Sequence, residues 1–174
     1  VKAFNFYAKT KLAFEAILRT YSQQLCINNF KLFSPFGEKD NSKLVPLIIK
    51  SALNEEHLTL SAGLQKLDFI YAKDIANAYM SAIDRIVEQF YQPEFEVFNL
   101  GSGVPLSVRD LVSIVEESLG YRIDVEWGRA SEKDIAVAYA DINKAKRVLN
   151  WVPKNGVKKG ILRTIEYYKN QGKS

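Results

Sequence analysis

An amphipathic stretch begins with Tyr7-Ala8-Lys9-Thr10-Lys11 and continues to about Leu25. Its periodicity predicts a helix over residues 6–25. On a helix, Tyr7 and Lys11 lie one turn apart on the same face, where the phenol and the ammonium can interact. A nearby cation favours the phenolate and lowers the pKa of a tyrosine from its ordinary value of about 10 toward the working range of acid–base chemistry. A surface helix can also carry this pair by chance, so the spacing alone leaves both interpretations open.

Helical and strand-like segments alternate along the rest of the chain. Short apolar runs with β-branched and aromatic residues predict strands, and apolar periods near 3.6 predict helices. The expected strands are 27–33, 58–60, 69–71, 95–100 and 123–127, and the expected further helices are 42–54, 75–90, 108–119, 142–149 and 157–169. Asp74 is expected to cap helix 75–90, while Ser107 and Gly120 are expected to begin and end helix 108–119. This alternation predicts an α/β architecture.

Composition narrows the class of protein. The chain has 174 residues, 47% of them hydrophobic, and its 24 basic and 20 acidic residues give a net charge of +4. Because basic and acidic residues are interspersed, we expect a mixed-charge surface and no nucleic-acid partner. Cys26 is the single cysteine, which excludes an internal disulfide and agrees with a reducing, cytoplasmic location.

Two further kinds of site are not expected from the sequence. His57, the single histidine, has no cysteine or carboxylate neighbour at ligand spacing, so we expect no metal site. No apolar run approaches the roughly 20 residues that a membrane span requires, and no signal peptide is visible, so we expect no membrane partner.

Four later motifs follow the opening helix in a fixed order. They are Cys26-Ile-Asn-Asn-Phe-Lys-Leu-Phe-Ser-Pro-Phe-Gly37, Gly63-Leu-Gln-Lys-Leu-Asp-Phe-Ile-Tyr71 with Asp74-Ile-Ala76, Phe98-Asn-Leu-Gly-Ser-Gly103, and Ala140-Asp-Ile-Asn-Lys-Ala145 with Leu149-Asn-Trp-Val-Pro153. Together with Tyr-x-x-x-Lys they resemble the extended short-chain dehydrogenase/reductases that act on nucleotide sugars, the NAD-dependent epimerase/dehydratase family.

The resemblance covers only part of such an enzyme. Members of the family begin with a strand, a Gly-x-x-Gly-x-x-Gly turn and a helix that receives the cofactor pyrophosphate, and this chain has no such turn. A catalytic Ser or Thr on a strand before the tyrosine is absent as well. The resemblance therefore implies the C-terminal part of a Rossmann-type doubly wound sheet plus a small α/β substrate-binding domain. Residues 1–37 would be the last elements of the dinucleotide-binding domain, and residues 38–174 would form mainly the nucleotide-sugar domain, with some segments returning to the sheet.

The resemblance also implies roles for the opening pair. Tyr7 would be the general acid/base that exchanges a proton with the sugar, and Lys11 would hold the nicotinamide ribose and lower the pKa of Tyr7. Cofactor contacts are expected from Tyr7, Lys11 and Phe33, and the cofactor would be NAD or NADP.

Substrate contacts are expected from Ser34, Lys66 and Arg129. Ser34 stands in a loop where the family commonly has an asparagine, and Leu67 stands where the family usually has a phosphate-binding arginine, with Lys66 one place earlier. Lysine offers a point charge and no planar fork. Arg129 matches the family's late diphosphate-clamping loop, although a surface arginine paired with Glu132 or Asp134 is the alternative.

The expected activity is hydride transfer at C4 of a nucleotide-diphosphate sugar, either 4-keto-sugar reduction or 4-epimerisation. The pattern is most similar to the abequose-synthase type of 4-keto-sugar reductase. Such enzymes commonly dimerise through the helix that bears the tyrosine, so we expect a homodimer. The alternative from another functional class is a non-catalytic nucleotide-sugar-binding or scaffold domain that lacks the cofactor half.

Overall fold

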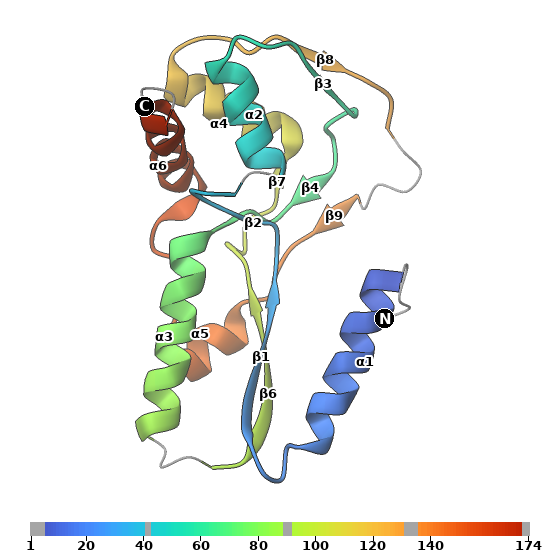
Figure 1. Cartoon of the computed structure of the whole chain (residues 1–174), viewed down its shortest axis with the longest axis vertical. Coiled ribbons are helices and arrows are strands. Elements are labelled where there is room, and N and C mark those ends of the chain that lie inside the picture. Colours follow the sequence, from blue (N-terminus) through green and yellow to red (C-terminus); the bar gives the residue numbers. More distant parts are fainter. Residues whose placement is uncertain (1–5, 41–42, 89–91, 131–135, 172–174) are drawn as a thin grey trace.

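Two long parallel strands organise the lower half of the molecule (Figure 1). In the computed structural model, which describes residues 6–40, 43–88, 92–130 and 136–171, β1 (Cys26–Leu32) pairs with β6 (Glu94–Leu100) over seven residues each. Parallel neighbours need a long crossover connection. Here two helices, at residues 44–53 and 72–88, lie in the described part of this crossover.

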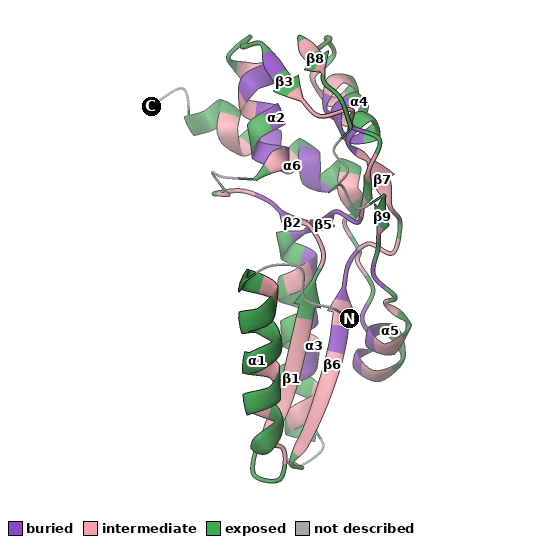
Figure 2. Ribbon diagram, turned by 90° about the vertical axis from the view of Figure 1, so that its right-hand side faces the viewer, coloured by how far each residue is buried: buried purple, intermediate pink, exposed green. Residues whose placement is uncertain are grey.

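Helices cover both faces of this strand pair. α1 (Phe6–Thr20) lies on one face, while α3 (Ala72–Glu88) and α5 (Asn143–Leu149) lie on the other (Figures 1 and 2). Successive residues of β1 reach opposite layers, as the strand period of two requires: the Lys31 ammonium lies 3.2 Å from the Glu15 carboxylate of α1, and the Phe30 ring lies 4.4 Å from the Tyr79 ring of α3.

The upper half consists of three helices and three small sheets (Figure 1). The helices are α2 (Leu44–Leu53), α4 (Val108–Leu119) and α6 (Gly156–Gln171). The sheets are β3 (Leu58–Leu60) parallel to β8 (Val125–Trp127), β2 (Pro35–Phe36) parallel to β5 (Ile70–Tyr71), and β4 (Lys66–Leu67) between β7 (Leu106–Ser107) and β9 (Val137–Ala138). These parallel pairs and their helices confirm the predicted α/β class.

The buried apolar residues fall into two clusters. The upper cluster joins α2, α4 and α6 through residues such as Ile48, Leu111 and Ile161. The lower cluster joins α3, β6 and α5 through residues such as Phe98 and Leu149. The domain boundary expected after residue 37 stays a prediction, because these clusters do not by themselves divide the chain there.

Both predicted ends of α4 are confirmed, whereas the predicted end of the opening helix is wrong. Ser107 caps α4 through a reciprocal capping box with Asp110, and Gly120 ends the helix in the left-handed conformation with φ 84°. The opening helix ends at Thr20, five residues before the expected position. The Tyr21 amide there bonds the Leu18 carbonyl at 3.0 Å, a tightened last turn that stops the helix.

Asp74 does not cap α3 as expected. The helix begins at Ala72, so Asp74 lies inside its first turn and is buried. Its carboxylate accepts hydrogen bonds from the Lys154 amide at 3.0 Å and from the Asn155 side chain at 2.7 Å. The carboxylate therefore anchors the segment before α6, a partner 80 residues away that no local capping rule anticipates.

A second buried aspartate, Asp68, joins three chain segments. Its carboxylate accepts hydrogen bonds from the amide and hydroxyl of Ser102, both at 2.6 Å, from the Gly103 amide at 3.0 Å and from the Ala140 amide at 2.9 Å. A side chain at Gly101 would overlap the carboxylate. The loops after β4, β6 and β9 therefore meet on a single acidic group.

Replacing Asp68 with alanine tests this junction. Three amides would lose their acceptor in a buried site, so Asp68→Ala is expected to lower the free energy of unfolding by about 3 kcal/mol or more. Urea unfolding followed by circular dichroism measures the change. The matched variant Asp84→Ala removes an exposed carboxylate of α3 and is expected to stay within about 0.5 kcal/mol of the parent; similar losses in the two variants would contradict the assignment.

A histidine directly before β3 contacts two acidic side chains of the neighbouring segment 124–126. The His57 Nδ1 lies 2.9 Å from Asp124 Oδ2, and its Nε2 lies 3.4 Å from Glu126 Oε2. These bonds, the one to Asp124 first, raise the pKa of His57 above its ordinary value of 6.5. The imidazole thus lies between the carboxylate of Asp124, directly before β8, and that of Glu126 in β8.

This contact makes stability depend on pH. Folding raises the pKa of His57, so the stabilisation is complete below the unfolded-state pKa near 6.5 and is lost as pH rises through the folded-state pKa. Because His57 is the only histidine, NMR titration of its imidazole reports the folded-state midpoint directly. We expect a midpoint above 6.5 that returns toward this value in the double variant Asp124→Asn, Glu126→Gln. An unchanged midpoint in the double variant would show that these carboxylates do not raise the pKa of His57.

Candidate active site

Tyr7 and Lys11 lie together in the first turns of α1. The Lys11 ammonium is 5.4 Å from the centroid of the Tyr7 ring, which is the contact that a four-residue helical spacing produces. The Tyr7 side chain is 68% exposed, so its hydroxyl is accessible from solvent. A bound molecule can therefore reach the phenol without a change in the helix.

The surroundings of this pair are open. α1 contains no buried residue, and Phe6, Leu12, Phe14 and Ile17 are exposed apolar side chains on it. Figure 2 shows α1 almost entirely as an exposed helix. Among the described residues, β1 beside it has β6 as its single strand partner. The Tyr7 pair thus lies on a helix whose apolar side chains are largely exposed.

Phe33 and Ser34 lie at the carboxyl end of β1, where ligands of open α/β sheets bind. The Phe33 amide bonds the Leu100 carbonyl at 2.9 Å, and the Ser34 carbonyl accepts the Ile70 amide at 3.3 Å. Ser34 has a φ of 22°, at the margin of the left-handed region that non-glycine residues rarely occupy. The chain therefore turns sharply here, directly before β2.

Lys66 and Arg129 belong to the upper half. Lys66 is an exposed residue of β4, and Arg129 is exposed after β8. The Gly128 amide, next to Arg129, bonds the Leu60 carbonyl at 2.8 Å. Within the described ranges, no hydrogen bond or ion pair joins Lys66 or Arg129 to the Tyr7 pair. The structure thus brings together Tyr7 with Lys11 and Phe33 with Ser34, and leaves the two upper cations separate from both.

The neighbouring Leu67 is a core residue. It is partly buried and packs against the upper hydrophobic cluster. An apolar side chain in this position offers no hydrogen bond to a phosphate. Sequence reasoning missed a different cation, Arg109, whose guanidinium lies 4.3 Å from the Trp127 ring. No sequence signal distinguishes Arg109 from an ordinary surface arginine in a first helical turn, because its partners come from distant segments.

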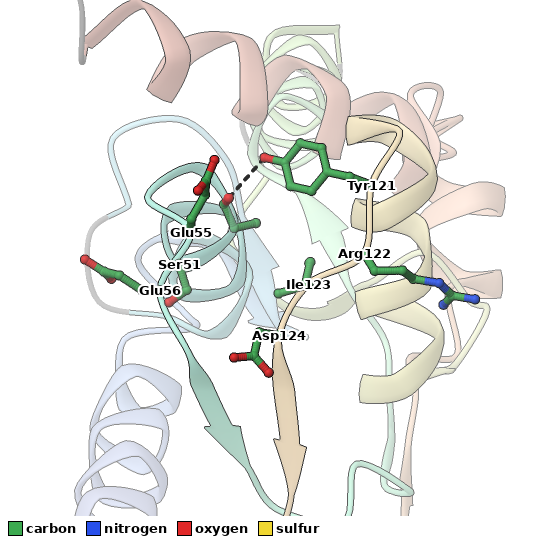
Figure 3. A pocket seen from close by; sticks show the side chains of 8 residues that line it. Ser51, Glu55, Glu56, Tyr121, Arg122, Ile123 and Asp124 are labelled. Carbon is green, nitrogen blue, oxygen red and sulfur yellow. Dashed lines mark hydrogen bonds between the residues drawn. The ribbon is translucent and has the colours of Figure 1, made fainter.

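A pocket of about 380 Å³ opens near the top of the molecule, away from α1 (Figure 3). It lies between the end of α2 and the loop from α4 to β8, and Tyr121 closes one side by donating a hydrogen bond to the Ala52 carbonyl at 3.0 Å. Glu55, Glu56 and Asp124 make its rim acidic. None of the predicted site residues lines it, and an acidic rim does not suit an anionic nucleotide.

Two structural features are absent from the described residues. No group of three or more histidine, cysteine or acidic side chains there is arranged to hold a metal ion. No described helix is both long enough and apolar enough to cross a membrane.

Several known sequences similar to this chain are named as nucleotide-sugar enzymes. A UDP-glucuronate 4-epimerase from Thermodesulfobacterium geofontis is 29% identical over 170 residues, which are 94% of this chain and 50% of that enzyme. A CDP-abequose synthase from Salmonella muenchen is 24% identical over 165 residues, covering 91% of this chain and 55% of that protein. The chain therefore spans about half the length of the curated relatives it matches.

Solved structures show the same fold. A UDP-glucose-4-epimerase from Stenotrophomonas maltophila, solved with bound NAD and formylated UDP-arabinopyranose, superposes with a TM-score of 0.89 at 24% identity, covering 99% of this chain and 57% of that one. Its Rossmann-type α/β arrangement agrees with the expected fold class. The sequence model of the NAD dependent epimerase/dehydratase family matches residues 1–101. That match spans more than half of the 174 residues, and the chain therefore belongs to this family.

Proposed function

We propose that this chain is part of an NAD(P)-dependent nucleotide-sugar epimerase or 4-keto-sugar reductase and carries its acid–base pair. The contact between the Tyr7 phenol and the Lys11 ammonium, at 5.4 Å from nitrogen to ring centroid, is the observation that carries the proposal. The family match and the relatives named above support the same activity. Without that contact, family membership alone would leave catalysis by this chain unsupported.

The pair suits proton transfer at a sugar hydroxyl. Tyr7 would accept the proton of the C4 hydroxyl as the carbon is oxidised, and would return it when a C4 ketone is reduced. Lys11 would stabilise the phenolate and would bind the ribose hydroxyls of the cofactor. A nicotinamide, when bound, accepts or supplies the hydride at C4. Reduction and epimerisation need the same two side chains.

This chain offers contacts for only one part of the cofactor. Tyr7 and Lys11 are exposed, which suits contact with the nicotinamide ribose, and Phe33 directly follows β1. The nine glycines of the chain form no Gly-x-x-Gly-x-x-Gly turn to hold the pyrophosphate. These residues would therefore contact NAD or NADP at its nicotinamide end.

The proposed substrate is a nucleoside diphosphate sugar. Ser34, Lys66 and Arg129 are the proposed contacts, and the exposure of both cations supports their access to an anionic ligand. The relatives are named for UDP- and CDP-linked reactions, which supports a pyrimidine nucleotide. A homodimer formed through α1 and a cytoplasmic location belong to the same proposal; the exposed apolar side chains of α1 support the dimer.

A non-catalytic nucleotide-sugar-binding domain is the second candidate. The exposed cations Lys66 and Arg129 would serve this candidate equally well, because binding a sugar nucleotide needs no redox chemistry. Isothermal titration of the chain with UDP-glucose, a CDP-sugar, NAD and NADP examines both candidates. We expect binding of a nucleotide sugar and weak or no binding of either dinucleotide; binding of none of the four would contradict both candidates.

Catalysis by Tyr7 is tested in a protein that joins this chain to a dinucleotide-binding half. Tyr7→Phe removes only the phenolic hydroxyl group and keeps the ring, so turnover is expected to fall by about 10²–10⁴-fold, with nucleotide-sugar affinity nearly unchanged. The matched variant Tyr21→Phe, just beyond the end of the same helix, is expected to keep parental turnover. Substantial turnover by Tyr7→Phe would leave the binding-domain candidate as the better explanation.

A further inference from the structure

Arg109 is held in one orientation by two contacts on different segments. Its Nε donates a hydrogen bond to the Ala62 carbonyl at 2.8 Å, and its guanidinium carbon lies 4.3 Å from the centroid of the Trp127 ring. A surface arginine normally moves among many rotamers, and ordering it costs free energy. Here the two contacts order the side chain in the folded protein, so a ligand that binds it does not have to order it.

The segment that holds Arg109 is itself tightly fitted. Gly63 has a φ of 70°, and a Cβ at this position would overlap the Trp127 ring and come within 3.1 Å of Arg109 Cγ. The Arg109 amide also bonds the Gly63 carbonyl at 3.2 Å. The glycine turn, the indole and the arginine therefore form one packed unit that fixes the direction of the guanidinium.

Two more cationic residues, Lys66 and Arg129, lie close in the chain to segments of this unit. Lys66 follows the Gly63 turn on β4, and hydrogen bonds from Ser107 together with the nearby Lys66 ammonium lower the pKa of Asp110, the residue after Arg109. Arg129 follows Gly128, whose amide bonds the Leu60 carbonyl at the other end of the turn. Lys66 therefore stands at one end of residues 60–66, and Arg129 follows the strand that pairs with Leu60 at the other end.

The outer nitrogens of Arg109 are available. Arg109 is exposed, and within residues 6–40, 43–88, 92–130 and 136–171 its only hydrogen-bond acceptor is the Ala62 carbonyl. Its Nη1 and Nη2 groups have no protein partner in these ranges. A planar guanidinium with two such nitrogens matches two oxygens of one phosphate. Neither Lys66 nor the core residue Leu67 can provide this geometry.

We propose that Arg109 binds the diphosphate of a nucleoside diphosphate sugar, with Lys66 and Arg129 adding positive charge around it. The inference rests on the proposed function and deepens it, because it assigns the phosphate-binding fork to a residue on α4. The alternative role for Arg109 is structural: it would only tie α4 to the Ala62 carbonyl.

Titration of the full chain with UDP tests the assignment. Arg109→Gln is expected to weaken UDP binding by about tenfold or more, because a charge-assisted, two-point contact is lost. Arg109→Lys keeps the charge without the fork and is expected to show an intermediate loss. The matched control Arg122→Gln removes an exposed arginine that pairs with Glu116 near the other end of α4, and it is expected to keep the parental affinity.

A spectroscopic readout separates binding from a structural role. In ³¹P NMR with saturating UDP, the phosphate resonances of the complex are expected to differ between the parent and Arg109→Lys, because the group facing the phosphates has changed. A purely structural arginine would leave these resonances unchanged in the folded variant. Thermal unfolding shows which variants are folded, and Arg109→Lys decides the question if Arg109→Gln does not fold.

The outcomes distinguish the two proposals. If the parent chain binds no UDP, the proposed function fails and this inference fails with it. If the parent binds UDP and both Arg109 variants bind it equally well, only this inference is overturned. Equal losses in Arg109→Gln and Arg122→Gln would also overturn it, because they would reflect net charge alone.

Discussion

The Asp68 carboxylate is the contact on which the arrangement of the two halves depends. It accepts four hydrogen bonds from Ser102, Gly103 and Ala140 while almost fully buried. A buried charge is tolerated only when its hydrogen-bonding capacity is filled. The end of β6, the end of β9 and the β4–β5 connection must therefore meet at this point or leave the carboxylate unsatisfied.

This constraint places the candidate site residues relative to one another. Residues of the lower cluster, such as Phe98, and of the upper cluster, such as Phe69, lie on chain segments that pass through the junction. Ser34 is tied to the same region, because its carbonyl accepts a hydrogen bond from the amide of Ile70, two residues after Asp68. Asp74 adds a second tie between α3 and the start of α6. Two buried carboxylates thus set where the strand end bearing Ser34 lies relative to β4 and its cation Lys66.

The sequence predicts local features of this molecule well and distant ones poorly. The α/β class, the Ser107 and Gly120 helix ends and the Tyr7–Lys11 spacing follow from periodicity and from short-range capping rules. Asp74 was expected to act within its own helix, whereas its partners lie 80 residues further along. The two-residue strands β2, β4, β7 and β9, and the contact of Arg109 with Trp127, were missed for the same reason. Their partners are brought together only by the fold, and no local pattern encodes them.

The exposure of Tyr7 limits what the pair can do by itself. A phenol that is 68% exposed exchanges protons with water, whereas electrostatic control of a developing alkoxide is strongest where water is excluded. Apolar side chains of the same helix, such as Phe6 and Phe14, are exposed as well. A helix that exposes both its phenol and its apolar side chains is suited to being covered by further polypeptide. The acid–base function proposed for Tyr7 therefore requires a cover over α1 as much as it requires Lys11.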